Sequence, residues 1–61
     1  MNISDAIQVV EYGDEDTDFN VEIEAYQTLI NAGLIWNMGP CYAEQAQYLI
    51  DFQVCHKAKG N

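Results

Sequence analysis

Few residues of this 61-residue chain could do chemistry, and their spacing does not assemble a catalytic group. Catalysis needs a nucleophile, or an acid and a base of adjusted strength, held in place by neighbours. The single histidine, His56, falls in a segment that we expect to be a solvated tail. No glycine-rich phosphate loop, serine-centred elbow or His-x-x-His pattern is present. We therefore expect neither enzyme activity nor a cofactor.

The two cysteines, Cys41 and Cys55, do not predict a metal site. A structural zinc ion needs four ligands, whereas Cys41, Cys55 and His56 supply three, two of them adjacent in sequence. No secretory leader precedes the cysteines, because the first residues have neither a basic start nor a long apolar run. We expect a cytoplasmic protein with two reduced thiols, and an intramolecular disulfide is the alternative.

The most unusual property of the sequence is its charge. Ten acidic residues stand against two lysines, which gives a formal net charge of −8. Nucleic-acid phosphates and anionic lipid headgroups attract basic residues, so we expect no direct binding to nucleic acid or to membranes. The expected partner is a basic protein surface, such as one that holds DNA or RNA. The alternative is that the charge only keeps a small protein soluble.

Eight of the ten acids fall within the first twenty-four residues, and no lysine occurs before Lys57. The run 14–18 superficially resembles a calcium loop, but Phe19 stands where such a loop needs glycine and Ala25 where it needs an acid. A solvated turn is the alternative for this run. We expect the region to bind a partner, because carboxylates form charge-assisted hydrogen bonds with arginine. The predicted binding residues are Glu11, Asp14, Glu15, Asp16, Asp18, Glu22 and Glu24.

Three helices are expected to position these residues in one small all-α domain spanning residues 1–61. Apolar residues recur with helical spacing over 3–12, 18–32 and 40–52. Asn2 or Ser4 can cap the first helix, and Thr17 or Asp18 the second, whose Glu22 and Glu24 should face water. The expected inward faces are Ile3, Ala6, Ile7 and Val10 in the first helix, Phe19, Ile23, Tyr26 and Ile30 in the second, and Tyr42, Ala46, Leu49 and Ile50 in the third.

A corner is expected between the second and third helices. Gly33 can take the positive φ that ends a helix, and Pro40 suits the first position of the next. The apolar segment 34–38 between them is predicted to be a buried link, in which Trp36 closes the core. A short strand or one further helical turn are the alternatives, although a lone strand has no partner here. Residues 54–61 are expected to form a solvated tail.

Residues 25–36 read AYQTLINAGLIW, and Leu49-Ile50 and Cys55 follow. This pattern resembles small uncharacterised bacteriophage proteins in which a helix ending LIDTGLxW precedes a second helix ending in LI and a cysteine. The likeness covers roughly residues 22–55. Where that family has a Tyr-Gly-Arg-Thr-Ala-like segment, this chain has CYAEQA over 41–46, and only Tyr42 fits. The resemblance implies a phage setting, in which small acidic proteins bind and disable host machinery.

Two functions from different classes follow. The first is a phage inhibitor, in kind an anti-CRISPR protein, that binds a basic nucleic-acid-handling host protein through its acidic face and competes with nucleic acid. The alternative is a structural or assembly module that homodimerises through an apolar surface formed by Trp36, Met38 and Tyr42.

Overall fold

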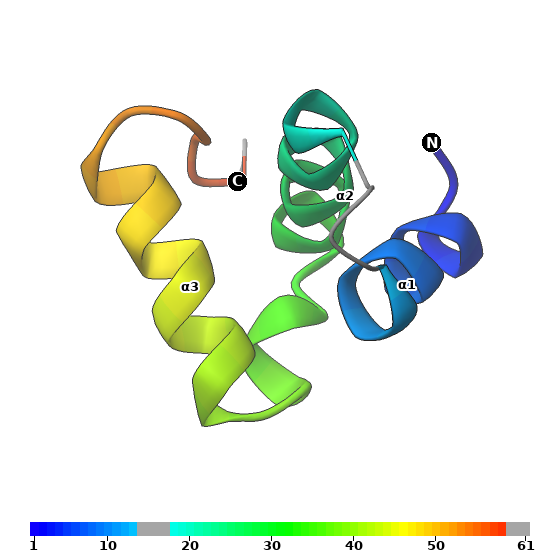
Figure 1. The fold of residues 1–61 in the computed structure, drawn as a ribbon. Coiled ribbons are helices and arrows are strands. Elements are labelled where there is room, and N and C mark those ends of the chain that lie inside the picture. The colour runs from blue at the N-terminus through cyan, green and yellow to red at the C-terminus, as the bar shows by residue number, and fades with distance from the viewer. Residues whose placement is uncertain (14–17, 59–61) are drawn as a thin grey trace.

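Three α-helices build the protein, and the computed structural model describes residues 1–13 and 18–58 (Figure 1). Helix α1 spans Ile3–Tyr12, α2 spans Phe19–Ala32 and α3 spans Pro40–Asp51, with a 3₁₀ turn, η1, at Ile35–Asn37. No strand occurs within the described ranges. The predicted all-α class is confirmed, and each helix bound lies within one residue of its prediction.

The first two helices begin at polar caps that the sequence indicates. Asn2 Oδ1 accepts a hydrogen bond from the backbone N–H of Asp5 at 2.7 Å. Asp18 Oδ1 accepts one from the N–H of Asn20 at 2.9 Å. Each bond satisfies a donor that the helix itself leaves without a partner. Asn2 and Asp18 therefore fix where α1 and α2 start.

The corner between α2 and α3 depends on two glycines. Gly33 has a φ of 75°, and the N–H of Leu34 folds back to donate to the carbonyl of Leu29 at 3.1 Å. Gly39 has a φ of 138° and a ψ of 160°, a combination that essentially only glycine adopts. Pro40 then occupies the first turn of α3, where its missing N–H costs nothing. Together they turn the chain from α2 through η1 into α3 (Figure 1).

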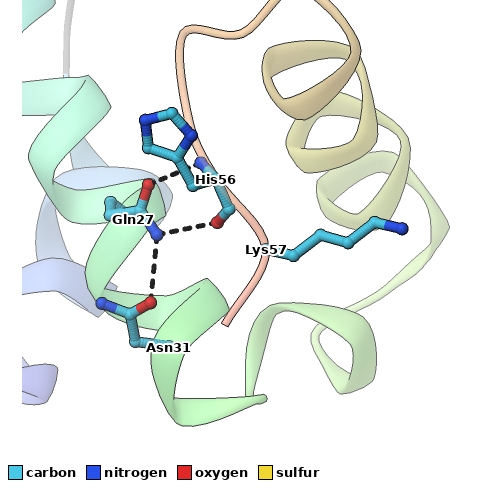
Figure 2. Close-up of a pocket in the computed structure, with 4 residues that line it drawn as sticks. All are labelled: Gln27, Asn31, His56 and Lys57. Atoms are coloured by element: carbon cyan, nitrogen blue, oxygen red, sulfur yellow. Dashed lines mark hydrogen bonds between the residues drawn. The ribbon is translucent and has the colours of Figure 1, made fainter. Parts of the chain in front are cut away.

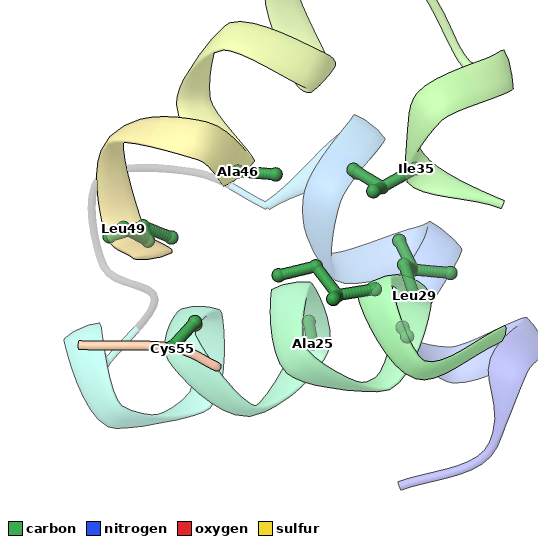
Figure 3. Packing of buried hydrophobic residues seen from close by; sticks show 8 residues of the cluster. Ala25, Leu29, Ile35, Ala46, Leu49 and Cys55 are labelled. Atoms are coloured by element: carbon green, nitrogen blue, oxygen red, sulfur yellow. The ribbon is translucent and has the colours of Figure 1, made fainter. Parts of the chain in front are cut away.

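The core is small and draws on every element. Helices α1 and α2 pack side by side, and α3 reaches the core through Ala46 and Leu49 (Figures 1 and 3). Ile35 enters from η1, and Cys55 enters from the segment after α3. Small side chains are common among these residues, which lets the backbones approach closely. The buried cluster is Ala6, Ala25, Leu29, Ile30, Ile35, Ala46, Leu49 and Cys55.

The link between α2 and α3 is only partly buried, so the prediction for Trp36 is wrong. Ile35 is fully buried and Met38 is half-buried, whereas Trp36 is 43% exposed. A 3₁₀ turn has three residues per turn, so residues 35 and 38 lie on one side of it and residue 36 does not. Leu34 is also exposed. The core is closed by Ile35 and not by the tryptophan.

The inward face of α2 also differs from the predicted stripe. Ile30 is buried and Ile23 and Tyr26 are half-buried, as expected, but Phe19 is 61% exposed. Ala25 is fully buried although it lies outside the predicted stripe. The physical reason is that α2 contacts α1, η1 and the chain after α3, so burial extends around more of the helix than one stripe.

The chain after α3 turns back toward α2 (Figure 1). Gln53 has a φ of 62°, and the N–H groups of Val54 and Cys55 donate to the carbonyl of Leu49 at 2.8 and 3.0 Å. This turn directs Cys55 into the core, where it is only 1% exposed. The prediction of a solvated tail from residue 54 is therefore wrong at Cys55. Residues 56–58 are exposed, and 59–61 lie outside the described residues.

Candidate functional site

The acidic arm, residues 11–24, contains all seven predicted binding residues. Glu11 lies in the last turn of α1 and Asp18 caps α2, so these two exposed carboxylates flank the same connection (Figure 1). The structure thus places Glu11 and Asp18 at the two helix ends that this connection joins. Three of the predicted residues lie outside the described ranges, namely Asp14, Glu15 and Asp16.

The other two predicted acids differ in their surroundings. Glu24 is exposed, and its Oε2 lies 3.1 Å from the amino group of Met1. Glu22 is half-buried, so the expectation that it faces water is wrong. Burial, and then the nearby charge of Glu22 and the neighbouring Tyr42, raise the pKa of the Tyr26 phenol above its ordinary value of 10.0. Glu22 therefore belongs partly to the packed side of α2, whereas Glu24 lies on its exposed side.

A junction that the sequence does not reveal joins α2 to the chain after α3. Gln27 Nε2 donates to the carbonyl of His56 at 2.9 Å and to Asn31 Oδ1 at 3.0 Å (Figure 2). Its Oε1 accepts the backbone N–H of His56 at 2.8 Å. Both N–H donors and the carbonyl acceptor of the Gln27 side-chain amide are therefore hydrogen-bonded within the protein. Gln27 and His56 are 29 residues apart, and no local pattern signals such a pair.

A cleft of about 430 Å³ opens at this junction, lined by Gln27, Asn31, His56 and Lys57. In Figure 2 the side chain of Lys57 extends away from Gln27 and Asn31, and the His56 ring lies on the other side of the segment. A ligand site needs polar groups that converge. The polar atoms of Gln27 are instead engaged within the protein, so the cleft is best described as part of the packing junction.

The buried thiol of Cys55 is not an activated nucleophile. Both cysteines are free, with Cys41 exposed and Cys55 buried. The Cys55 thiol lies 3.7 Å from the carbonyl of Ile23, and burial raises its pKa above the ordinary value of 9.0. A raised pKa disfavours the reactive thiolate. No group of three or more His, Cys, Asp or Glu side chains in the described ranges could hold a metal ion.

Exposed aromatic residues form the remaining candidate surface. The rings of Tyr48 and Phe52, on the outer side of α3, pack with their centroids 4.5 Å apart. Of the three residues expected to form a dimer interface, only Trp36 is exposed. Met38 and Tyr42 are half-buried and pack against the core, so the predicted apolar surface is not one continuous face.

Comparison with known protein families identifies the family of this chain. A family model described as a domain of unknown function, DUF7417, matches residues 2–60. The chain belongs to the DUF7417 family. No curated protein and no solved structure matches the chain. The DUF7417 match spans the acidic arm and α3 alike, and its description names neither an activity nor a bacteriophage.

One further property of this DUF7417 domain is the length of its helices. None of the helices in the described ranges has the length and the apolar composition needed to cross a membrane. The longest of them, α2, has fourteen residues, whereas a membrane-spanning helix needs about 20.

Proposed function

We propose that this DUF7417 protein is a phage-encoded inhibitor that acts in the cytoplasm of a bacterial host. It binds a basic, nucleic-acid-handling defence protein, such as a CRISPR effector, through the acidic arm and so competes with nucleic acid. One observation carries the proposal: the exposed carboxylates of Glu11 and Asp18 stand on either side of a segment with three more acids. The similarity of residues 25–36 to small phage proteins supports the phage setting.

Two carboxylates of the arm, those of Glu11 and Asp18, are exposed and available for an external partner. Within residues 1–13 and 18–58, the single ion pair joins Glu24 to the amino group of Met1. Glu11 and Asp18 therefore have no internal cation among the described residues. Arginine binds such carboxylates through charge-assisted and often bidentate hydrogen bonds. A basic groove that normally holds phosphates would supply those arginines.

The charge distribution favours fast encounter with such a groove. Eight acids lie in residues 1–24, whereas residues 34–58 carry only Glu44 and Asp51 against Lys57. A one-sided field of this kind steers an oppositely charged partner toward the arm. Because exposed charges are screened over about 8 Å at physiological ionic strength, binding should weaken steeply as salt is added.

Affinity capture from a bacterial lysate tests the proposal. The baits are the wild type, an arm variant with Glu11→Gln and Asp18→Asn, and a control variant with Glu44→Gln and Asp51→Asn. Both variants remove two charges, and asparagine at residue 18 keeps a helix cap. We expect the wild type and the control to capture the same basic protein and the arm variant to lose it. Circular dichroism checks that all three baits stay helical.

A competition assay then tests the mechanism on the captured protein. We expect the wild type to displace a fluorescent DNA or RNA duplex from that protein, as measured by fluorescence anisotropy. The arm variant should displace it at least about tenfold less well, equivalent to roughly 1.4 kcal/mol. Equal capture and equal displacement by the two charge variants would show that the acidic arm is not the binding surface.

A further inference from the structure

The chain after α3 is held along one side of α2. Ile23 and Gln27 are four residues apart, so they lie one above the other on that helix. The Cys55 thiol lies 3.7 Å from the carbonyl oxygen of Ile23, and the Gln27 amide pairs with both backbone groups of His56 at 2.8 and 2.9 Å. Figure 2 shows this segment running beside α2. Residues 53–58 are here called the strap.

One side chain anchors the strap in the core. Cys55 is 1% exposed, whereas residues 53, 54 and 56–58 are exposed. Cys55 is one of the eight buried residues of the core, and the other seven belong to α1, α2, η1 and α3. The helices therefore pack mainly against one another, and the strap adds a single small side chain to their core.

The other contacts of the strap with α2 are hydrogen bonds that water can replace. Both bonds between Gln27 and His56 are exposed. Gln53, where the strap begins, has a φ of 62°, which costs energy for glutamine and which the residue can leave once the strap is released. Few buried apolar contacts and exposed hydrogen bonds are typical of segments that open locally, at a lower free energy than global unfolding.

We propose that the strap opens from α2 as one unit, by rotation at Gln53, while the three helices stay packed. The opening brings the Cys55 sulfur into solvent, because this sulfur is buried in the closed state. The strap thus controls when the Cys55 thiol can react, whereas Cys41 is already exposed. The opening involves none of the carboxylates of the acidic arm, so it does not depend on the proposed function.

Alkylation of Cys55 by iodoacetamide tests the proposal, in a Cys41→Ser background that leaves Cys55 as the single thiol. The thiolate displaces iodide and forms a thioether, and mass spectrometry follows the rate. Relative to the unfolded protein in concentrated urea, the native protein should react faster than its global stability allows. The rate should hardly change when about 1 M urea is added, whereas reaction through global unfolding would speed up about fivefold.

Three variants in the same background separate the strap from the rest of the fold. Gln27→Met keeps a similar shape without charge but loses the bonds to His56, so alkylation should be at least about fivefold faster. Gln47→Met removes an exposed bond to Asp51 in α3 and should leave the rate unchanged. Asn2→Ala removes the cap of α1 and lowers global stability, yet should also leave the rate unchanged. Equal acceleration by Gln27→Met and Asn2→Ala, or none by Gln27→Met, overturns the proposal.

Amide hydrogen exchange tests whether the helices stay packed when the strap is open. A group attached to the Cys55 sulfur does not fit the closed state, so the alkylated protein should lose protection at the His56 N–H. The N–H groups of Leu29 and Ile30, two buried residues of α2, should stay protected. Loss of protection at Leu29 and Ile30 as well, or retained protection at His56, shows that the strap does not open as a separate unit.

Discussion

Two side chains far apart in sequence, Gln27 and Cys55, hold residues 55 and 56 against α2, and neither belongs to a recognisable motif. Cys55 fills the core as a small apolar residue with a weak S–H donor, which is a common use of a free cysteine. Gln27 pairs with both backbone groups of His56, much as a neighbouring strand would. The segment after α3 is thus held by one buried contact and one amide, and each of these can be tested.

Burial of the Cys55 thiol predicts a loss of stability at alkaline pH. Its pKa is raised in the folded protein, so the unfolded chain loses the proton first as pH rises. The free energy of unfolding should be constant below the ordinary value of 9.0 and fall above it, until the folded thiol also ionises. Tyr26 adds a similar fall only above its ordinary value of 10.0. Urea unfolding under reducing conditions between pH 7 and pH 10 measures the effect.

Two cysteine variants separate this effect from general alkaline unfolding. Cys55→Ala should lower stability by about 1 kcal/mol at neutral pH, because it leaves a small cavity, and should remove the fall that begins at pH 9. Cys41→Ser changes an exposed thiol and should keep the wild-type profile. If Cys55→Ala loses stability between pH 9 and pH 10 as steeply as the wild type, the buried thiol is not the cause.

The Gln27 junction predicts a local effect on the segment after α3. Gln27→Glu keeps the shape of the side chain and the acceptor for the His56 N–H, but it loses the two N–H donors. We expect a loss of about 1 kcal/mol and faster amide hydrogen exchange at Cys55 and His56. The control Gln47→Glu removes one exposed bond to Asp51 and should leave that exchange unchanged. Equal exchange rates in both variants would contradict the role of Gln27.

At this scale the sequence states residue types directly, but it does not state where the side chains lie. The burial of Cys55 and the exposure of Trp36 depended on a turn at Gln53 and on three-residue periodicity at η1. A hydropathy pattern does not contain either feature, because each follows from backbone geometry that tertiary contacts select.

The helices themselves were predictable because their ends carry strong local signals. Asn2 and Asp18 supply caps, Gly33 supplies a left-handed residue, and Pro40 opens α3. Each signal acts within about four residues, so it does not depend on tertiary packing. The face of α2 was harder to predict, because small Ala25 contributes little to an apolar stripe yet lies where other elements pack closely.

Two glycines that follow helices should respond oppositely to the same substitution. Gly33 follows α2 with a φ of 75°, so Gly33→Ala should lower stability by about 1 kcal/mol, although its new Cβ meets no atom within 4 Å. Gly13 follows α1 with a φ of −63°, which alanine adopts freely. Gly13→Ala should be neutral or stabilise by about 0.5 kcal/mol by restricting the unfolded chain. Thermal unfolding of both variants measures the difference, and a Gly33→Ala protein as stable as Gly13→Ala would contradict it.

At Gln53, which follows α3, the opposite substitution can be tested, in which glycine replaces another residue at a positive φ. It has a left-handed φ of 62°, which glutamine adopts only at a cost. Gln53→Gly should therefore raise the free energy of unfolding by about 0.5–1 kcal/mol, since glycine takes this conformation without strain. The control Gln53→Ala keeps the strain and should change little. Urea unfolding compares the three proteins, and a loss of stability in Gln53→Gly would show that the glutamine side chain itself contributes.

As a whole, the molecule combines a small core with a large unbalanced charge. A domain of this length is marginally stable, at roughly 3–5 kcal/mol. Three of the eight core residues are alanines, and several large apolar side chains are exposed. Selection for solubility alone would explain the charge, but it would not explain why eight of the ten acids lie within residues 1–24.

The concentration of negative charge in the acidic arm predicts how thermal stability depends on salt. Mutual repulsion among the acids destabilises the folded state, and the described residues contain a single ion pair whose attraction salt could weaken. Sodium chloride, from about 20 mM to about 500 mM, should therefore raise the thermal midpoint, because it shortens the screening length. The arm variant, Glu11→Gln with Asp18→Asn, should respond less than the Glu44→Gln and Asp51→Asn control. The slope against salt is the decisive quantity, since Asp18→Asn also alters a helix cap. A falling midpoint, or equal slopes in the two variants, would show that repulsion is not concentrated in the arm.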